Sequence, residues 1–206
     1  MIRSSLLIAS ASVALSGCAL LASPDPVQLY RFGGASAFAG TGATSACPDV
    51  HVSMRRVDFS EASRGDRILA VTGAEAAYIK GARWVSPAET LFEEALRNAF
   101  LDGGTCTVLS SGPLTRDGLL LSVDVRRFEA AYAAPDVVPD ANIVVLLRLI
   151  RPGDRSIVAE DRIAVSESAG ENRQSAIVAA FDRATAEASR QIVLWTDQQG
   201  FQATRN

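Results

Sequence analysis

The chain has 206 residues, of which 48% are hydrophobic and 21% are charged, and its formal net charge is −3. This composition is typical of a globular domain and excludes a disordered chain, while the acidic balance argues against a nucleic-acid partner, because phosphate binding needs a positive surface. No apolar run reaches the roughly 18–20 residues of a spanning helix, which excludes a polytopic membrane protein.

The first 17 residues have the order of a secretory signal peptide: Arg3 gives a positive start, a short apolar run follows, and small residues precede the point of cleavage. The next residue completes the tetrapeptide Leu-Ser-Gly-Cys, which resembles a bacterial lipobox. In lipobox proteins the cysteine thiol is modified with diacylglycerol, and cleavage before the cysteine leaves an N-terminus that is acylated. We therefore expect residues 1–17 to be removed and Cys18 to carry a lipid anchor. The alternative is an ordinary secretory peptide with a cysteine at this position by chance.

Residues 18–26 are expected to form a short lipidated tether, in which Pro24 and Pro26 disfavour a helix. An extended residue spans at most about 3.6 Å, so the single domain expected over residues 27–206 should lie close to its membrane. In enteric lipoproteins an aspartate directly after the cysteine favours retention in the inner membrane. Ala19 stands there in this chain. By that resemblance we expect an anchor in the inner leaflet of the outer membrane, with the domain facing the periplasm.

Four strands are predicted in the first half of the domain, where apolar residues alternate with polar ones or lie between turn residues. They cover residues 27–32, 50–57, 67–71 and 75–79. The segment 33–48 is rich in glycine, alanine, serine and threonine and predicts a flexible loop. Thr72-Gly73-Ala74 predicts a hairpin turn between the third and fourth strands.

The clearest local pattern predicts an amphipathic helix that begins near Ser86. Serine at the N-cap, Pro87 at the first helical position and Glu89 at the third are the signature of a capping box. Apolar residues then recur at helical spacing on one face, namely Leu91, Phe92, Ala95, Leu96, Ala99 and Phe100. Gly103 and Gly104 predict that the helix ends through a residue with positive φ.

The second half repeats the pattern of strands followed by a helix. Strands are predicted over residues 105–109, 119–126, 142–150 and 156–165, and a helix over about 173–198. The segment 129–141 predicts a loop, and Pro152-Gly153-Asp154 predicts a hairpin turn. Each helix has one apolar stripe, and most strands have one apolar face. The sequence therefore predicts an α+β fold, a two-layer sandwich of a mixed, mostly antiparallel sheet with two helices on one face.

Two cysteines remain besides Cys18, and the periplasm permits disulfides, so Cys47 and Cys106 are predicted to form one. Two separate, partly buried thiols are the alternative. The sequence contains no cysteine–histidine spacing typical of a metal site and no motif of a serine hydrolase, a metalloprotease or a phosphate loop. His51 is the sole histidine and is interpreted as a surface residue on the polar side of a strand. We therefore expect no enzyme, no metal and no cofactor.

Two features suggest a surface that binds a partner. Arg148 lies inside an otherwise apolar strand, and a buried arginine would need a carboxylate partner. We therefore expect Arg148 on the uncovered face of the sheet, with a place near the strand end as the alternative. Tyr78, Arg83 and Trp84 gather around Gly81, and arginine and aromatic residues are enriched at interface hot spots. The alternative for Trp84 is a structural contact with the start of the following helix.

Several stretches occur in an order that is itself informative. The run YRFGG follows soon after Cys18, RILAV comes next, and AAYIKGARWVSPAETLFEEALRNAF leads into the first helix. A strand ending in Phe128-Glu129 follows, and the chain closes with Ala180, Phe181, Ala184, Ile192 and Trp195 at a fixed spacing. Together these stretches resemble the ABC-type transport auxiliary lipoproteins, the family that accompanies MCE-type lipid transporters. The resemblance covers nearly the whole chain after Cys18.

The resemblance implies a periplasm-facing lipoprotein that docks onto an MCE-domain protein. The MCE-domain protein carries lipid between the inner and outer membranes, driven by an inner-membrane ABC transporter. No catalytic residues are implied, and because some members of the family assemble as rings, a homo-oligomer is compatible with the resemblance. The alternative function is an outer-membrane assembly lipoprotein that binds a β-barrel or a lipopolysaccharide exporter. A cell-envelope hydrolase would need a serine or carboxylate cleft, which the sequence does not indicate.

Overall fold

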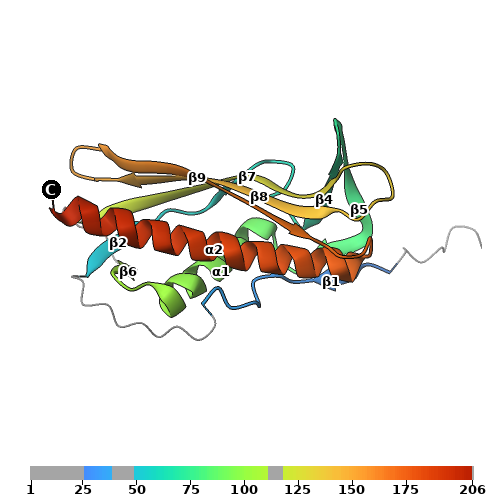
Figure 1. Ribbon diagram of the computed structural model, residues 1–206, viewed down its shortest axis with the longest axis horizontal. Coiled ribbons are helices and arrows are strands. Elements are labelled where there is room, and N and C mark those ends of the chain that lie inside the picture. The colour runs from blue at the N-terminus through green and yellow to red at the C-terminus, as the bar shows by residue number, and fades with distance from the viewer. Residues whose placement is uncertain (1–25, 39–48, 111–117, 206) are drawn as a thin grey trace, which may run out of the picture.

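The computed structural model describes residues 26–38, 49–110 and 118–205. In chain order the elements are β1 (Gln28–Tyr30), β2 (Val50–Met54), β3 (Asp58–Phe59), β4 (Arg67–Thr72), β5 (Glu75–Trp84), α1 (Ala88–Gly103), β6 (Thr107–Leu109), β7 (Leu119–Tyr132), β8 (Asp140–Ile150), β9 (Ile157–Ser168) and α2 (Gln174–Arg205). One large open sheet and two helices form two layers (Figure 1), which confirms the fold class predicted from the sequence.

The long strand β7 holds the sheet together. One of its edges pairs with β8, and β9 follows on the outside of β8. Three short strands share its other edge, β2 at its start, β3 in its middle and β4 at its end. β6 extends the sheet beyond β2, while β5 and then β1 extend it beyond β4. The antiparallel pairings are long and the parallel ones span two or three residues each, so the sheet is mixed and mostly antiparallel.

Both helices lie against the same face of the sheet (Figure 1). Residues at helical spacing in α1, from Ala88 through Phe92 and Leu96 to Phe100, are buried there. α2 has 32 residues, and at 1.5 Å per residue its length of about 48 Å lets it run along the sheet. No helix of the described residues lies against the other sheet face, which we call the open face.

Several segments extend further than the sequence patterns predict, among them β5, which continues to Trp84 beyond the predicted end at residue 79. β7 continues through Tyr132, although residues 129–141 read as a loop, because Ala130 pairs with Ala70 of β4 on one side and with Ala141 of β8 on the other. Strand pairing on both edges outweighs the weak strand preference of this alanine-rich segment. α2 likewise continues to Arg205, beyond the predicted end at residue 198.

The predicted capping box at the start of α1 is wrong. Pro87 occupies the N-cap position and no side chain donates or accepts a capping hydrogen bond. Instead, the backbone N–H of Ala88 donates to the carbonyl of Gly65 at 3.0 Å. The carboxylate of Glu89 is engaged elsewhere, because its Oε1 accepts a hydrogen bond from Arg56 at 2.8 Å. Backbone carbonyl groups of the loop before β4 thus cap the helix.

This geometry predicts that Ser86→Ala has little effect on stability. Loss of a true N-cap side chain costs about 1 kcal/mol, whereas a surface change away from such features stays within about 0.5 kcal/mol. We expect the smaller value, measured as the change in the free energy of unfolding in urea. A loss of about 1 kcal/mol or more would mean that Ser86 caps the helix in solution.

The two glycines that end α1 are required by close approach, and the predicted positive φ is wrong. Gly104 has a φ of −66°, and its N–H donates to the carbonyl of Phe100. A Cβ on Gly104 would lie 2.7 Å from the carbonyl oxygen of Phe100, and a Cβ on Gly103 would overlap the ring of Phe38. The two glycines therefore predicted the end of the helix correctly, but the reason for them is close packing and not a positive φ.

Candidate functional site

Trp84 is a core residue, which corrects its interpretation as a partner contact. Its side chain is 2% exposed. The indole packs edge-on against Phe32 at 4.9 Å and against Phe181 at 5.4 Å between ring centroids. Because these contacts bury the ring between the sheet and α2, Trp84 is not available to a partner. Its role is structural, but its ring partners lie in the segment after β1, in β7 and in α2.

Tyr78 and Arg83 lie on the open face of the sheet. Tyr78 stands opposite Leu69 and Arg83 opposite Arg67, and residues opposite each other across a strand pair share a face. The register shifts between these two pairs, at a bulge where Gly81 adopts a φ of +71°. The bulge changes the alternation of side chains along β5, so Tyr78 and Trp84 face opposite sides of the sheet.

Both residues make defined contacts on this face. Arg83 donates from Nη1 to both carboxylate oxygens of Asp66, at 3.0 and 2.9 Å, and both side chains remain about half exposed. The hydroxyl of Tyr78 donates to the carbonyl of Ala62 at 3.0 Å, while the Arg67 guanidinium stacks 3.7 Å from the centroid of the Tyr78 ring. These contacts hold Tyr78 and Arg83 in place while leaving part of each side chain accessible.

Arg148 also lies on the open face, which confirms its expected position. It stands opposite Glu160 of β9, and its Nε donates to Oε1 of Glu160 at 2.7 Å, with both side chains about half exposed. Arg148 and Glu160 line a shallow groove of about 320 Å³ together with Leu146 and Arg162. β7 and β4 lie between β8 and β5, so the structure does not bring Arg148 together with Tyr78 and Arg83.

A second hollow, of about 380 Å³, lies between the β4–β5 hairpin and the end of β7. It is lined by Tyr78, Tyr132, Ile79 and Pro135 among others. Tyr132 donates to Oδ1 of Asn172 at 3.0 Å, and burial raises the pKa of the Tyr132 hydroxyl. Sequence reasoning missed Tyr132 because it placed this residue in a loop, and the aromatic residue in an alanine-rich stretch was the signal that could have found it.

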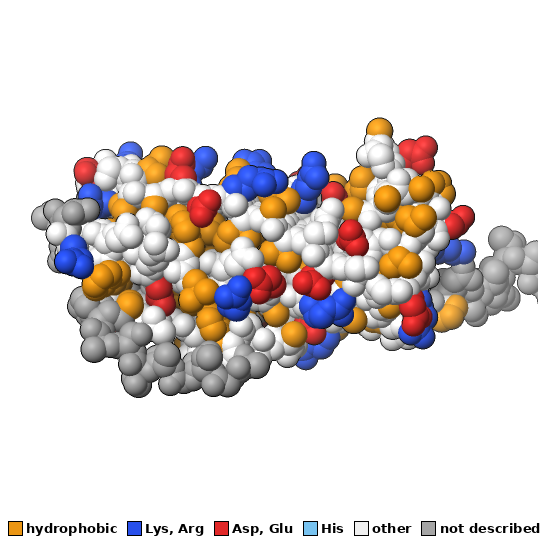
Figure 2. Space-filling model, viewed as in Figure 1, with side chains coloured by type: hydrophobic (Ala, Val, Ile, Leu, Met, Phe, Trp, Pro, Cys, Tyr) orange, Lys and Arg blue, Asp and Glu red, His pale blue; other side chains and the backbone are white. Residues whose placement is uncertain are grey.

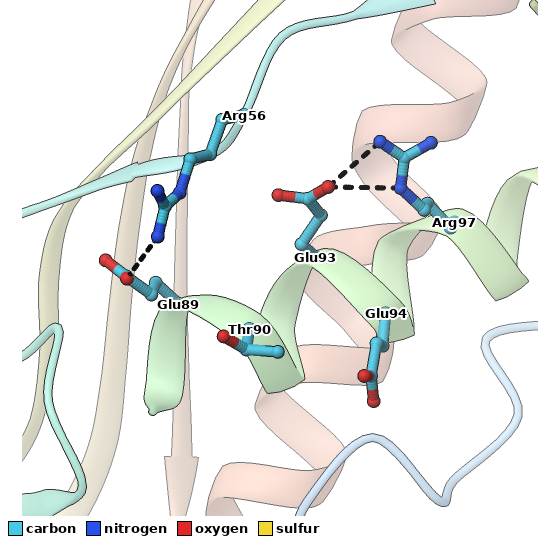
Figure 3. A pocket seen from close by; sticks show the side chains of 6 residues that line it. All are labelled: Arg56, Glu89, Thr90, Glu93, Glu94 and Arg97. Atoms are coloured by element: carbon cyan, nitrogen blue, oxygen red, sulfur yellow. Dashed lines mark hydrogen bonds and ion pairs between the residues drawn. The ribbon is translucent and has the colours of Figure 1, made fainter. Parts of the chain in front are cut away.

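A third hollow, of about 230 Å³, lies on α1 beside the loop after β2 and has charged walls. Figure 3 shows that these charges are directed at one another. Arg56 contacts Glu89 at 2.8 Å, and Arg97 donates from Nε and Nη2 to Oε1 of Glu93 at 3.1 and 2.9 Å, while Glu94 points away. This hollow is therefore a solvated surface of paired charges, typical of an exposed helix face.

Charged side chains and possible metal ligands do not gather at one place on the described surface. Figure 2 shows basic and acidic side chains interspersed along the molecule. Within residues 26–38, 49–110 and 118–205, no three His, Cys, Asp or Glu side chains come together as metal ligands. In the same ranges no helix combines the length and apolar character needed to cross a membrane.

Two carboxylates of α2 hold loops that are distant from them in the sequence. Asp197 accepts hydrogen bonds from the backbone N–H groups of Thr105 and Thr107, at 2.8 and 2.9 Å, and is only 7% exposed. Asp182 accepts three backbone N–H groups with Oδ1, those of Gly33 at 2.7 Å, Gly34 at 2.9 Å and Ala35 at 3.2 Å. These contacts fix the loop after β1 and the turn between α1 and β6.

The three cysteines are only partly described. Cys106 directly precedes β6 and is disulfide-bonded. Cys18, the predicted lipidation site, and Cys47, the predicted disulfide partner, lie outside the described residues. Lipidation of Cys18 and the pairing of Cys47 with Cys106 therefore stay predictions.

One large open sheet with two helices on one of its faces defines a domain of the two-layer α+β class. A family model described as the ABC-type transport auxiliary lipoprotein component matches residues 35–193. The chain belongs to this family, as its sequence motifs predicted. The family is described as a transport auxiliary component and not as a family of enzymes.

Two solved structures share the fold, and a third is similar over part of the chain. A protein from Xanthomonas campestris, assigned to the DUF330 family, is 24% identical, covers 87% of this chain and 100% of its own, and has a TM-score of 0.76. An uncharacterized protein is 16% identical, covers 82% of this chain and 98% of its own, and has a TM-score of 0.62. A putative lipoprotein from Caulobacter crescentus is 24% identical over 57% of this chain and 85% of its own, with a TM-score of 0.41. No curated protein matches the chain.

Proposed function

We propose that this protein is a lipid-anchored, periplasm-facing accessory subunit of an ABC lipid transport system, and that it docks onto an MCE-domain protein. Membership of the transport auxiliary lipoprotein family, over residues 35–193, is the observation that carries this proposal. The lipobox ending at Cys18 supports an envelope location. Ala19 supports an anchor in the inner leaflet of the outer membrane, by resemblance to enteric lipoproteins.

The open face is the surface we assign to the docking of that partner. The helices leave it uncovered (Figure 1), and it presents Tyr78, Arg83 and Arg148. Leu146 contributes an apolar residue to the groove beside Arg148. Protein interfaces combine arginine and tyrosine with apolar contacts and a polar rim, which is the composition found here.

Each of the two covalent proposals is tested by its own mass-spectrometric measurement. Intact-mass analysis of the protein from the membrane fraction should give a chain that begins at Cys18 with added acyl mass, because several acyl chains are needed for lasting anchorage. Peptide analysis without reduction should find Cys47 joined to Cys106, as the periplasm permits. Acyl-free protein, or free Cys47 thiol in the native protein, would contradict the respective proposal.

The docking proposal predicts a crosslink from the open face. A photoreactive residue at position 148 should capture an MCE-domain protein in intact cells, whereas one at position 94 should not, because Glu94 is exposed on the helical side of the domain. The substitution at position 148 should leave the domain folded, because loss of a half-exposed ion pair costs at most about 1 kcal/mol of unfolding free energy. Capture of a β-barrel protein from position 148 would favour the alternative function. Equal capture from both positions would contradict docking on the open face.

A further inference from the structure

One end of the domain is defined by the point at which the chain enters the sheet. β1 runs parallel to β5 with Gln28 beside Ala82, so the chain before Gln28 approaches alongside the earlier residues of β5. That end of β5 forms a hairpin with β4, whose last residue, Thr72, lies beside Tyr132 at the end of β7. The β4–β5 turn, the β7–β8 loop (residues 133–139) and the entry of β1 therefore share one end, which we call the tether end.

The entry point is held firmly. The hydroxyl of Tyr30 donates to Oε1 of Gln174 at 3.3 Å, and Nε2 of the same glutamine donates to the carbonyl of Lys80 at 2.8 Å. β1, β5 and the first turn of α2 are thereby joined by one side chain. The chain enters the domain at a fixed position, and Pro26, the last residue of the tether, is the first residue that the structure describes.

The length of the tether limits where this end can lie. If Cys18 carries the anchor, eight residue steps separate it from Pro26, and at 3.6 Å each they span at most about 29 Å. α2 alone is about 48 Å long, from 32 residues at 1.5 Å each. The tether is shorter than the domain, so the tether end stays near the membrane, and a partner that arrives from the other membrane meets the remaining surface.

Apolar residues are exposed at this end. Val137 and Val138 are 38% and 43% exposed at the tip of the β7–β8 loop, between Pro135 and Pro139. Asp136 beside them has a φ of +63°, a conformation that few residues other than glycine adopt and that turns the loop at this point. Figure 2 shows hydrophobic side chains gathered at the end where β4, β5 and this loop lie.

The neighbouring surfaces suit a lipid–water boundary. Val27 and Leu29, on the entering chain, are 48% and 54% exposed. Tyr132 lines the hollow behind the loop, and tyrosine combines an apolar ring with a polar tip, which favours the interface between water and lipid. Charges of both signs occur here, such as the exposed pair of Glu171 and Arg173 at 3.2 Å, so contact at this end does not depend on an anionic surface.

We propose that the tether end rests on the bilayer that holds the anchor, with the loop 133–139 at the lipid–water boundary. This inference depends on the lipid anchor in the proposed function, but not on the identity of the transport partner. It orients the domain, because the β8–β9 turn and the C-terminal end of α2 then point away from the membrane. The occupant of the apolar loop tip is thus a bilayer and not a second protein.

The test uses the full-length lipoprotein in vesicles of phosphatidylethanolamine and phosphatidylglycerol. A photoreactive residue replaces Val138 at the tether end, Gly153 in the β8–β9 turn, or exposed Ala164 on the open face. Position 138 should form several-fold more lipid adducts than either control position. Added salt should change this ratio little, because apolar contact is not screened.

The possible results separate the two proposals. Equal or greater lipid labelling from position 153 or 164 would overturn the orientation, even with Cys18 acylated and the MCE partner captured. Protein adducts instead of lipid adducts from position 138 in native membranes would also overturn it. A chain without acyl mass would remove the anchor, and this inference with it. An acylated chain that labels lipid from position 138 supports the inference whether or not the partner is found.

Discussion

Replacement of Phe128 by alanine is expected to lower the free energy of unfolding by about 3–5 kcal/mol. Phe128 is 2% exposed and lies at the centre of an aromatic cluster. Its ring centroid is 4.7 Å from that of Phe181, 5.0 Å from Phe32, 5.5 Å from Phe59, and 6.3 Å from Trp84 and from Phe92. These rings come from the sheet, both helices and the segment after β1, so the substitution opens a cavity where all parts of the fold meet.

Urea unfolding measures this effect, with Phe201→Ala as the matched control. Phe201 lies near the C-terminus of α2, where its ring is partly exposed beneath the Arg205 guanidinium at 5.5 Å. Its loss should cost about 1 kcal/mol or less, because no closed cavity results. Similar losses for the two variants would contradict the central place of Phe128. If both variants keep the dependence of the unfolding free energy on urea concentration, the substitutions have changed stability and not the surface exposed on unfolding.

The sequence predicted the helices well because their information is local. Apolar residues at a spacing of 3.6 run through α1 and α2, and that periodicity alone identified the buried faces containing Phe92 and Phe181. The apolar stripe on each helix was also the basis for predicting a two-layer fold. The strand order did not, because β2, β3 and β4 share one edge of β7 through connections whose pairing depends on contacts far apart in sequence.

The candidate surface was predicted in part for a similar reason. Arg148 was placed correctly, since alternation along β8 is regular and leaves it on the open face. Trp84 was not, because the bulge at Gly81 shifts the alternation along β5, and a glycine in a strand does not by itself reveal the size of such a shift. Tyr78 and Arg83 consequently belong to the open face while the neighbouring indole belongs to the core.

Asp197→Ala is expected to lower the free energy of unfolding by about 3 kcal/mol. Hydrogen bonds to a charged group are strong, and the substitution removes the acceptor of the buried Thr107 N–H. Oδ2 accepts the N–H and the hydroxyl of Thr105, both at 2.8 Å, and Oδ1 accepts the N–H groups of Cys106 at 3.4 Å and Thr107 at 2.9 Å. One carboxylate thus holds the turn between α1 and β6. Without it, the buried N–H of Thr107 and the part-buried donors of Thr105 and Cys106 lose this acceptor.

Asp182→Ala is the matched comparison, because this carboxylate also accepts consecutive backbone N–H groups, those of Gly33, Gly34 and Ala35. The glycine loop is more exposed than the turn at Thr107, so water can replace the lost acceptor there and the cost should be about 1 kcal/mol. Asp197→Asn should fall between the two, because an amide keeps one acceptor oxygen but turns donor groups toward other donors. Urea unfolding of the three variants measures this order. Equal losses for Asp182→Ala and Asp197→Ala would contradict burial as the cause of the difference.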